Sequence, residues 1–174
     1  AAQLGVSRLP LREAMQRLSQ LGVIDEKPGV GTRIIKGDPS TWVSNLQAPF
    51  LSDAQAALEL LEARRTLEST IIQASMRNLK NDDMLLLQDD IDKMERALEK
   101  KDKEAYLQGD LSFHFHLAAG THNRYLMHML KTIQKLLEQF MMEIFNEIPA
   151  LIPDSMIHHK RIFEHVKNHD LKAA

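Results

Sequence analysis

Residues 110–123, DLSFHFHLAAGTHN, place a carboxylate and an imidazole four residues apart, at Asp110 and His114. At ~100° per residue this spacing puts both side chains on one helix face, about 40° apart. The apolar side chains of the same helix surround that face, at Tyr106, Leu107, Phe113 and Leu117. Asp110 and His114 are therefore expected to point into a core, where buried polar groups need partners. His116 falls well outside the apolar arc and is expected to be solvated.

A second inward-facing imidazole is predicted near the end of the chain. Residues 154–168 read as a helix whose apolar side chains share one side, at Met156, Ile162, Phe163 and Val166. His159 lies at the centre of that side, and the neighbouring imidazoles lie near or beyond its edge, at His158 and His165. Neutral imidazoles and a carboxylate suit Zn²⁺, Ni²⁺ or Mn²⁺. Asp110, His114 and His159 are thus candidate metal ligands, and their spacing leaves a hydrogen-bonded network equally open.

An inward-facing cation is predicted on the helix that covers residues 53–78. The apolar arc of this helix consists of Leu60, Ala63, Leu67, Ile71 and Ala74. Arg64 falls inside the arc, and a guanidinium in such a place requires an anion. Glu68, one turn further on, is one candidate partner, and a ligand is the other; the sequence leaves both open.

The rest of the chain after Ser52 also reads as helix. No glycine occurs between Asp53 and Gly109. Hydrophobic periodicity and capping residues predict helices over 53–78, 82–99, 103–119, 123–147 and 154–168, with a further one opening at Asp170. The methionines of 123–147 are typical of core packing or a dimer interface rather than of a soft-metal site.

Composition limits the class of protein. The chain has 174 residues, of which 44% are apolar and 26% charged, as expected of a soluble globular protein. No apolar run is long enough to span a membrane, and nothing resembles a signal peptide. The absence of cysteine excludes disulfides, thiolate metal sites and cysteine nucleophiles, and it fits a cytoplasmic location.

The charge is unevenly distributed along the chain. Residues 1–36 carry six Lys or Arg against three Asp or Glu, a net +3. Because the whole chain is −2, the remainder is −5. A basic N-terminal segment followed by an acidic remainder suggests that the N-terminal segment binds a polyanion.

The pattern of the basic N-terminal segment predicts a helix-turn-helix with a wing. Gly5 sits in a turn, Ser7 is a good N-cap, and Pro10 fits the first turn of the helix that follows. Short strands are predicted at Val23-Ile24 and Arg33–Ile35. The intervening Pro28–Gly31 reads as a hairpin tip that can bring backbone N–H groups close to phosphates.

Residues 4–34, LGVSRLPLREAMQRLSQLGVIDEKPGVGTRI, resemble the winged helix-turn-helix of the GntR regulators. The motifs GVSRxPxREAxxRLxxxG and PGxGT carry the resemblance. It implies contacts with operator DNA by Ser7, Arg8, Arg12, Gly29 and Thr32. Leu9 departs from the small polar residue often found there. The family's first helix would lie upstream of Ala1, so this domain is expected to be N-terminally incomplete.

The opening segment, extended to Leu126, resembles the D-x-x-F-H-x-x-L…N-x-x-L motif of the FCD domain, the all-helical effector domain of the FadR branch of GntR regulators. EARRTLE (62–68) and HKRIFEHVKNHD (159–170) resemble two other FCD segments. In metal-binding members the positions of Asp110, His114 and His159 are ligands. The resemblance implies a fourth histidine, expected beyond Ala174, and a small carboxylate effector bound against the metal with Arg64 as a second contact.

The sequence thus predicts a mainly α protein: a winged helix-turn-helix over residues 1–36, a linker over 37–52 containing Trp42, and an all-α bundle over 53–174. We expect a DNA-binding transcriptional regulator, a repressor, controlled by a small organic or sugar acid and acting as a homodimer, rather than an enzyme. Two alternatives are a metal-dependent hydrolase in a helical bundle and a metal-free effector-binding regulator. The hydrolase reading lacks a clear general base beside the site and leaves the winged helix without a role.

Overall fold

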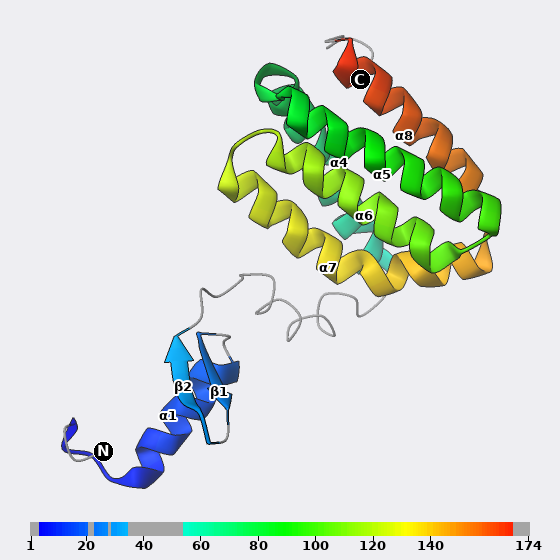
Figure 1. The fold of residues 1–174 in the computed structure, drawn as a ribbon. Helices are drawn as coiled ribbons and strands as arrows, with labels where there is room; N and C mark the ends of the chain where they lie inside the picture. Colours follow the sequence, from blue (N-terminus) through cyan, green and yellow to red (C-terminus); the bar gives the residue numbers. More distant parts are fainter. Residues whose placement is uncertain (1–3, 21–22, 28, 35–53, 169–174) are drawn as a thin grey trace. The chain divides into compact units, whose positions relative to one another are not determined.

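The computed structural model describes residues 4–20, 23–27, 29–34 and 54–168 (Figure 1). The chain divides into two compact units, Ala1–Pro49 and Phe50–Ala174, which we describe separately. The predicted linker with Trp42 and the helix predicted from Asp170 lie outside the described residues. No described helix is both long and apolar enough to cross a membrane.

The first unit contains helix α1 (Arg8–Gln20) and a two-stranded antiparallel sheet of β1 (Ile24–Lys27) and β2 (Gly31–Ile34). Ile24 pairs with Ile34, and Lys27 pairs with Gly31. The turn between the strands has Gly29 at φ 76° and Gly31 at φ 109°, a region in which side chains other than glycine are strained. The predicted helix and two-stranded wing are therefore both present.

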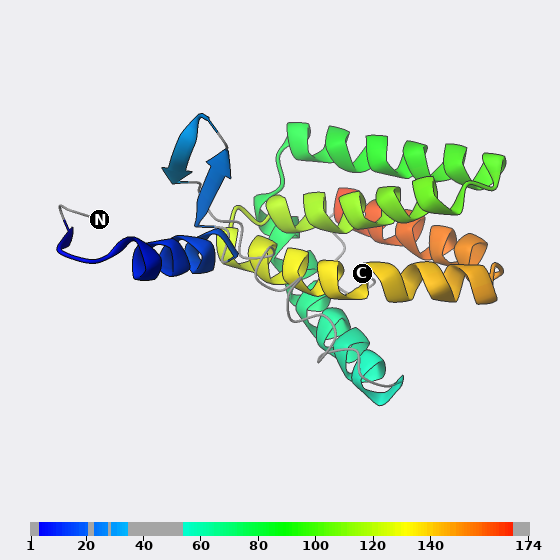
Figure 2. The same cartoon turned by 90° about the horizontal axis from the view of Figure 1, so that it is seen from below.

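The second unit is a bundle of α4 (Ala54–Asn78), α5 (Asn81–Lys100), α6 (Lys103–Ala119), α7 (Arg124–Glu147) and α8 (Leu151–Lys167). Helices α5, α6 and α7 lie side by side, α4 crosses behind them, and α8 lies along α5 (Figure 1). In the turned view the first turns of α4 extend beyond the other helices (Figure 2). Because α6 touches α4, α5 and α7, its side chains reach the centre of the bundle.

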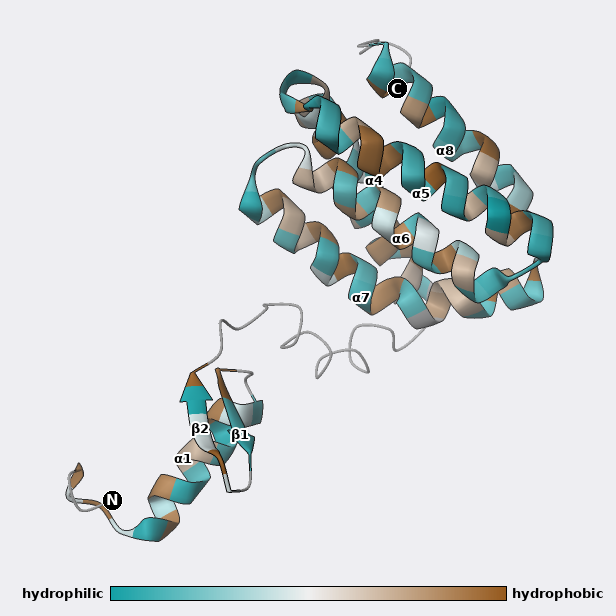
Figure 3. Ribbon diagram, viewed as in Figure 1, coloured by the Kyte–Doolittle hydropathy of each residue, from teal (hydrophilic) through white to brown (hydrophobic). Residues whose placement is uncertain are grey.

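The helices bury one face and expose the other, as the periodicity predicts. Apolar and polar residues alternate around α5 and α7 (Figure 3), and the largest fully buried side chains include Tyr106, Phe113 and Phe145. The rings of Phe145 and Tyr106 pack in a T-shaped arrangement, with centroids 5.9 Å apart. These side chains hold α6 against α7, and so position the inward face that carries Asp110.

The helix ends agree with the predicted bounds within three residues. Asp102 caps α6, its carboxylate accepting from the N–H of Ala105 at 2.9 Å. Helix α8 begins three residues earlier than predicted, at Leu151, and includes Pro153. Proline is tolerated there because the N–H groups of a helix's first turn have no partner within the helix.

Helices α5 and α6 approach closely near one glycine. A Cβ at Gly109 would lie 2.6 Å from Cγ of Met94 on α5, far inside van der Waals contact. Met94 is itself fully buried, so this approach depends on the missing side chain at Gly109.

Candidate metal centre

The structure brings the three predicted ligands together at the centre of the bundle. Asp110 and His114 lie one turn apart on α6, and His159 faces them from α8. His159 Nε2 is 3.1 Å from Asp110 Oδ1 and 3.1 Å from His114 Nε2. All three side chains are buried, and one ligand atom from each lies within 4.8 Å of the others.

A hydrogen-bond acceptor lies beside Nδ1 of each imidazole, and these acceptors indicate which ring nitrogen carries the proton. Nδ1 of His114 lies 3.1 Å from Oε1 of Glu68, and Nδ1 of His159 lies 2.8 Å from the backbone carbonyl of Ser155. A carboxylate and a carbonyl only accept, so each Nδ1–H donates. In a neutral imidazole the lone pair is then on Nε2. Two nitrogen lone pairs and a carboxylate oxygen therefore converge on one point.

Three converging acceptors repel one another unless a cation lies between them. Burial lowers the pKa of His114 to about 4, so this ring is neutral near pH 7. Burial also opposes a charge on His159, but the hydrogen bond to Asp110, the charge of that carboxylate and the hydrogen bond to the Ser155 carbonyl together outweigh it and raise the pKa of His159. Burial alone would raise the pKa of Asp110, yet the hydrogen bond from His159 and the nearby imidazoles hold it well below its usual range. A proton on His159 is one such cation, and a divalent metal is another.

The Arg64 guanidinium joins the same cluster through protein carboxylates. Its Nε donates to Oε1 of Glu68 at 2.7 Å, and Nη2 lies 3.5 Å from Oδ2 of Asp110. The pair with Glu68, one of the two partners left open by the sequence, is present. Two of the five N–H donors of a guanidinium are used in these contacts, which leaves donors for a ligand.

Glu68 is a site residue that the sequence reasoning did not assign. It was considered only as a partner of Arg64, yet its Oε1 also accepts from Nδ1 of His114. Its position four residues after Arg64, on the same inner face of α4, was the available signal.

The expectation that His116 is solvated is wrong. Its Nδ1 lies 2.5 Å from Oδ2 of Asp90 on α5, and its side chain is 26% exposed. Asp90 is fully buried, and burial raises its pKa despite the contact with His116. A helical wheel identifies the one apolar face of a helix. It did not show that α5 covers a second side of α6, the side on which His116 lies.

The predicted DNA-facing residues all lie at the surface of the first unit. Ser7 precedes α1, and Arg8 and Arg12 lie one turn apart on it, all three exposed. Gly29 is in the wing turn and Thr32 is on β2, both exposed. Their contact with DNA stays a prediction.

The low pKa of His114 predicts how the stability of the metal-free protein depends on pH. Below pH 6.5 His114 becomes protonated in the unfolded state. In the folded state, where its pKa is about 4, it stays neutral until the pH is much lower. The raised pKa of His159 stabilises the folded state, and this contribution no longer changes once the pH is below 6.5. It therefore does not oppose the trend from His114. We expect the free energy of unfolding to fall by about 2 kcal/mol from pH 6.5 to pH 5 through His114.

Urea unfolding in EDTA measures this change. His114→Gln removes the titrating ring, so its stability should fall less over the same range than that of the wild type. Equal slopes in the two proteins would contradict the assignment of a neutral buried His114.

Comparison with known proteins covers both units. The FCD domain model matches residues 59–174, and the model for bacterial regulatory proteins of the gntR family matches residues 1–34. The chain is 28% identical over 131 residues to the Uxu operon transcriptional regulator of Escherichia coli (strain K12), covering 75% of this chain and 51% of that protein. It is 28% identical over 143 residues to the HTH-type transcriptional regulator LutR of Bacillus subtilis (strain 168), covering 82% and 64%.

A third relative is the putative L-lactate dehydrogenase operon regulatory protein of Escherichia coli (strain K12), 33% identical over 137 residues, covering 75% of this chain and 51% of that protein. The chain thus spans about half to two thirds of the length of these curated relatives.

Among solved structures, Streptococcus agalactiae GntR superposes with a TM-score of 0.71 at 25% identity, over 100% of this chain and 78% of that one. E. coli McbR/YncC superposes with a TM-score of 0.65 at 20% identity, over 99% and 75%, a likeness of fold.

Proposed function

Because the chain belongs to the FCD-domain proteins of the gntR family of bacterial regulators, we propose that it is a DNA-binding transcriptional repressor controlled by a small carboxylate. The carboxylate binds in the helical unit against a divalent metal held by Asp110, His114 and His159. The winged helix binds operator DNA, and a homodimer matches the two-fold symmetry usual for operators.

The observation that carries the metal proposal is the convergence of two Nε2 atoms and a carboxylate oxygen, with each Nδ1 facing a separate acceptor, Glu68 or the carbonyl of Ser155. Ligands of one ion with bonds of ~2.1 Å lie about 3.0–3.4 Å apart, and the two measured separations are 3.1 Å. When bound, the metal would supply a Lewis acid for a carboxylate oxygen.

The charge of the cluster supports an anionic effector. Arg64 contributes one positive charge, Glu68 and Asp110 contribute two negative charges, and neutral imidazoles contribute none. A divalent ion then leaves the buried cluster with a net positive charge of one. A monocarboxylate would neutralise it, and an uncompensated charge in a buried site is costly.

Helix α4 is the element through which the site can act on the rest of the chain. It carries Arg64 and Glu68 and is the first described helix after the N-terminal unit. An effector that draws the Arg64 guanidinium toward its own carboxylate changes the contacts that hold α4 to α6. We infer that this difference favours one arrangement of the winged helices over another and so alters operator affinity.

Hydrolysis is less well supported by the same geometry. The described carboxylate next to the three ligands is Glu68, and Arg64 and His114 both engage it. A general base needs a lone pair directed at the water, and those contacts direct it elsewhere.

The name of one relative, a putative L-lactate dehydrogenase operon regulatory protein, supports a small hydroxy acid as the class of effector.

The test uses duplex DNA selected from a random pool by the protein. Operator affinity is measured by fluorescence anisotropy while a panel of small organic and sugar acids is added, with Zn²⁺, Ni²⁺ or Mn²⁺ and again in EDTA. We expect at least one acid to change the affinity tenfold or more, and only in the metal-loaded protein. Sequence-selective binding that no acid changes would contradict the effector proposal, and binding of no DNA sequence would contradict the regulator proposal.

Glu68→Gln is expected to weaken metal binding about 10–100-fold. The amide no longer carries the negative charge that holds Nδ1–H of His114, so the ring's orientation and basicity at Nε2 both suffer. Competition with a chromogenic chelator measures the metal affinity. Glu62→Gln, an exposed change of the same kind on α4, is the matched control. Equal affinities in the two variants would show that Glu68 has no role at the metal.

A further inference from the structure

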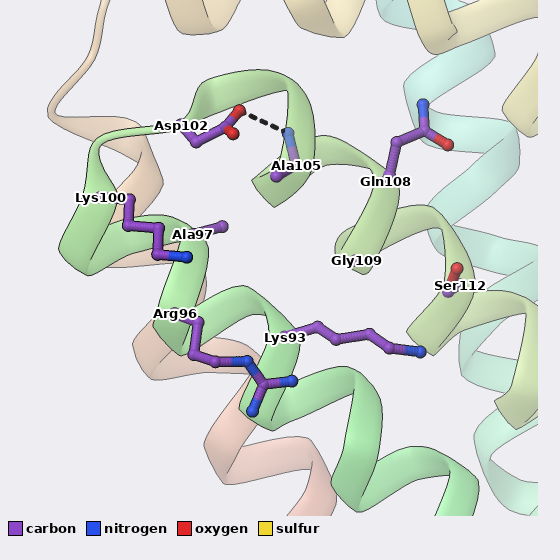
Figure 4. Close-up of a pocket in the computed structure, with 9 residues that line it drawn as sticks. All are labelled: Lys93, Arg96, Ala97, Lys100, Asp102, Ala105, Gln108, Gly109 and Ser112. Atoms are coloured by element: carbon purple, nitrogen blue, oxygen red, sulfur yellow. Dashed lines mark hydrogen bonds between the residues drawn. The ribbon is translucent and has the colours of Figure 1, made fainter.

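A groove on the outer side of the bundle lies between α5 and α6, with a volume of about 450 Å³ (Figure 4). Its α6 wall is built from small side chains, chiefly Ala105, Gly109 and Ser112. These positions repeat at four- and three-residue spacing, so they form one strip along the helix. Gly109 lies where α6 approaches Met94 of α5 most closely, so the two helix backbones come together at the floor of the groove.

The α5 wall of the groove is basic. Lys93, Arg96 and Lys100 recur at three- and four-residue spacing and line the same side, over about 10 Å of helix. Figure 4 shows Lys93 reaching across toward Ser112 and the guanidinium of Arg96 standing beside it. Cations near the C-terminus of a helix interact favourably with the helix dipole. The dipole does not, however, require that all three cations line the same groove.

Two of these cations lack an internal counter-ion. Lys93 lies 2.6 Å from the Asp89 carboxylate, whereas neither Arg96 nor Lys100 forms an ion pair within the part of the chain that the structure describes. Ser112 places a hydroxyl on the facing wall, whereas the amide of Gln108 donates to Glu138 on α7 at 3.5 Å. The groove therefore offers charged donors on one side and a neutral hydroxyl on the other.

We propose that this groove binds a small phosphate ester as a second ligand, separate from the metal centre. A phosphate monoester carries up to two negative charges and three acceptor oxygens, and a guanidinium can contact two of those oxygens at once. Arg96 and Lys100 bind the phosphate, while Ser112 faces the esterified alcohol.

The surroundings favour a small anion over a nucleic-acid backbone. The basic stretch is short and ends at Asp102 on one side and at Asp89 on the other. Residues 37–174 carry a net charge of −5, because residues 1–36 carry +3 and the whole chain −2. A long polyanion would meet these carboxylates, whereas a single phosphate fits between them.

Isothermal titration calorimetry on the full chain, at constant ionic strength, tests the proposal. The probes are glucose 6-phosphate and inorganic phosphate, with glucose and sulfate as controls. We expect glucose 6-phosphate to bind, glucose not to bind, and Arg96→Ala or Lys100→Ala to weaken binding at least tenfold. Arg161→Ala is the matched control, since Arg161 is an exposed arginine on α8, and it should bind as the wild type does.

The outcome is separable from that of the metal site. In the His159→Ala variant or in EDTA, binding of glucose 6-phosphate should persist; its loss there would place the ligand at the metal and overturn the proposal. Equal binding by Arg96→Ala, Lys100→Ala and Arg161→Ala would also overturn it, as would no binding by the wild type. Random duplex DNA that binds through Arg96 while glucose 6-phosphate does not would identify a nucleic-acid surface instead.

Discussion

His159→Ala is expected to raise the dissociation constant for a divalent metal at least 100-fold. His159 Nε2 lies 3.1 Å from each of the other two ligand atoms, so its removal opens the cluster on the α8 side. Asp110 and His114 remain, and two ligands from one helix hold such ions poorly. Equilibrium dialysis against Zn²⁺ or Ni²⁺ followed by elemental analysis gives the bound stoichiometry.

His158→Ala supplies the matched control, because His158 is the adjacent imidazole and is exposed. It should retain the metal stoichiometry of the wild type. Loss of metal in both variants would point to adventitious histidine binding, and full retention in His159→Ala would rule out the proposed ligand set. Circular dichroism of each variant checks that the bundle is still helical.

Arg8→Ala combined with Arg12→Ala is expected to weaken operator binding by about 30-fold to 10⁴-fold, at ~1–3 kcal/mol for each arginine that contacts a base. Both side chains are exposed and belong to α1, so the change removes the proposed DNA contacts without removing core packing. If either arginine instead contacts a phosphate, the slope of affinity against salt should fall by about one per contact. Fluorescence anisotropy at several salt concentrations separates the two cases.

The charge-matched control is Arg65→Ala combined with Arg161→Ala, two exposed arginines of the helical unit. It changes the net charge equally and should leave operator affinity within about twofold. Undiminished DNA binding by Arg8→Ala with Arg12→Ala would show that α1 is not the recognition helix.

The central part of the site could be predicted because it depends on periodicity within single helices. The four-residue spacing of Asp110 and His114 among aromatic neighbours fixes an inward direction, and the same reasoning applied to α8 selects His159 over His158. Capping residues and the long apolar patterns predicted the helix bounds for the same reason: these signals are local.

Contacts between helices were harder to predict. Glu68 reaches His114 across α4 and α6, and Asp90 reaches His116 across α5 and α6. Neither pair has a sequence spacing that signals it, because the rotation and offset of packed helices decide which side chains meet. Helix α8 starts three residues before the predicted bound, and Pro153 is accommodated in its first turn.

The tight approach at Gly109 also has an evolutionary consequence. A β-carbon at position 109 would lie only 2.6 Å from Cγ of Met94. A substitution at one of these two positions therefore constrains the other. In homologous sequences the two columns should covary: alanine or serine at the glycine position should accompany a side chain shorter than methionine at its partner. Such compensated exchanges would preserve the helix spacing next to Asp110, and with it the alignment of the ligands.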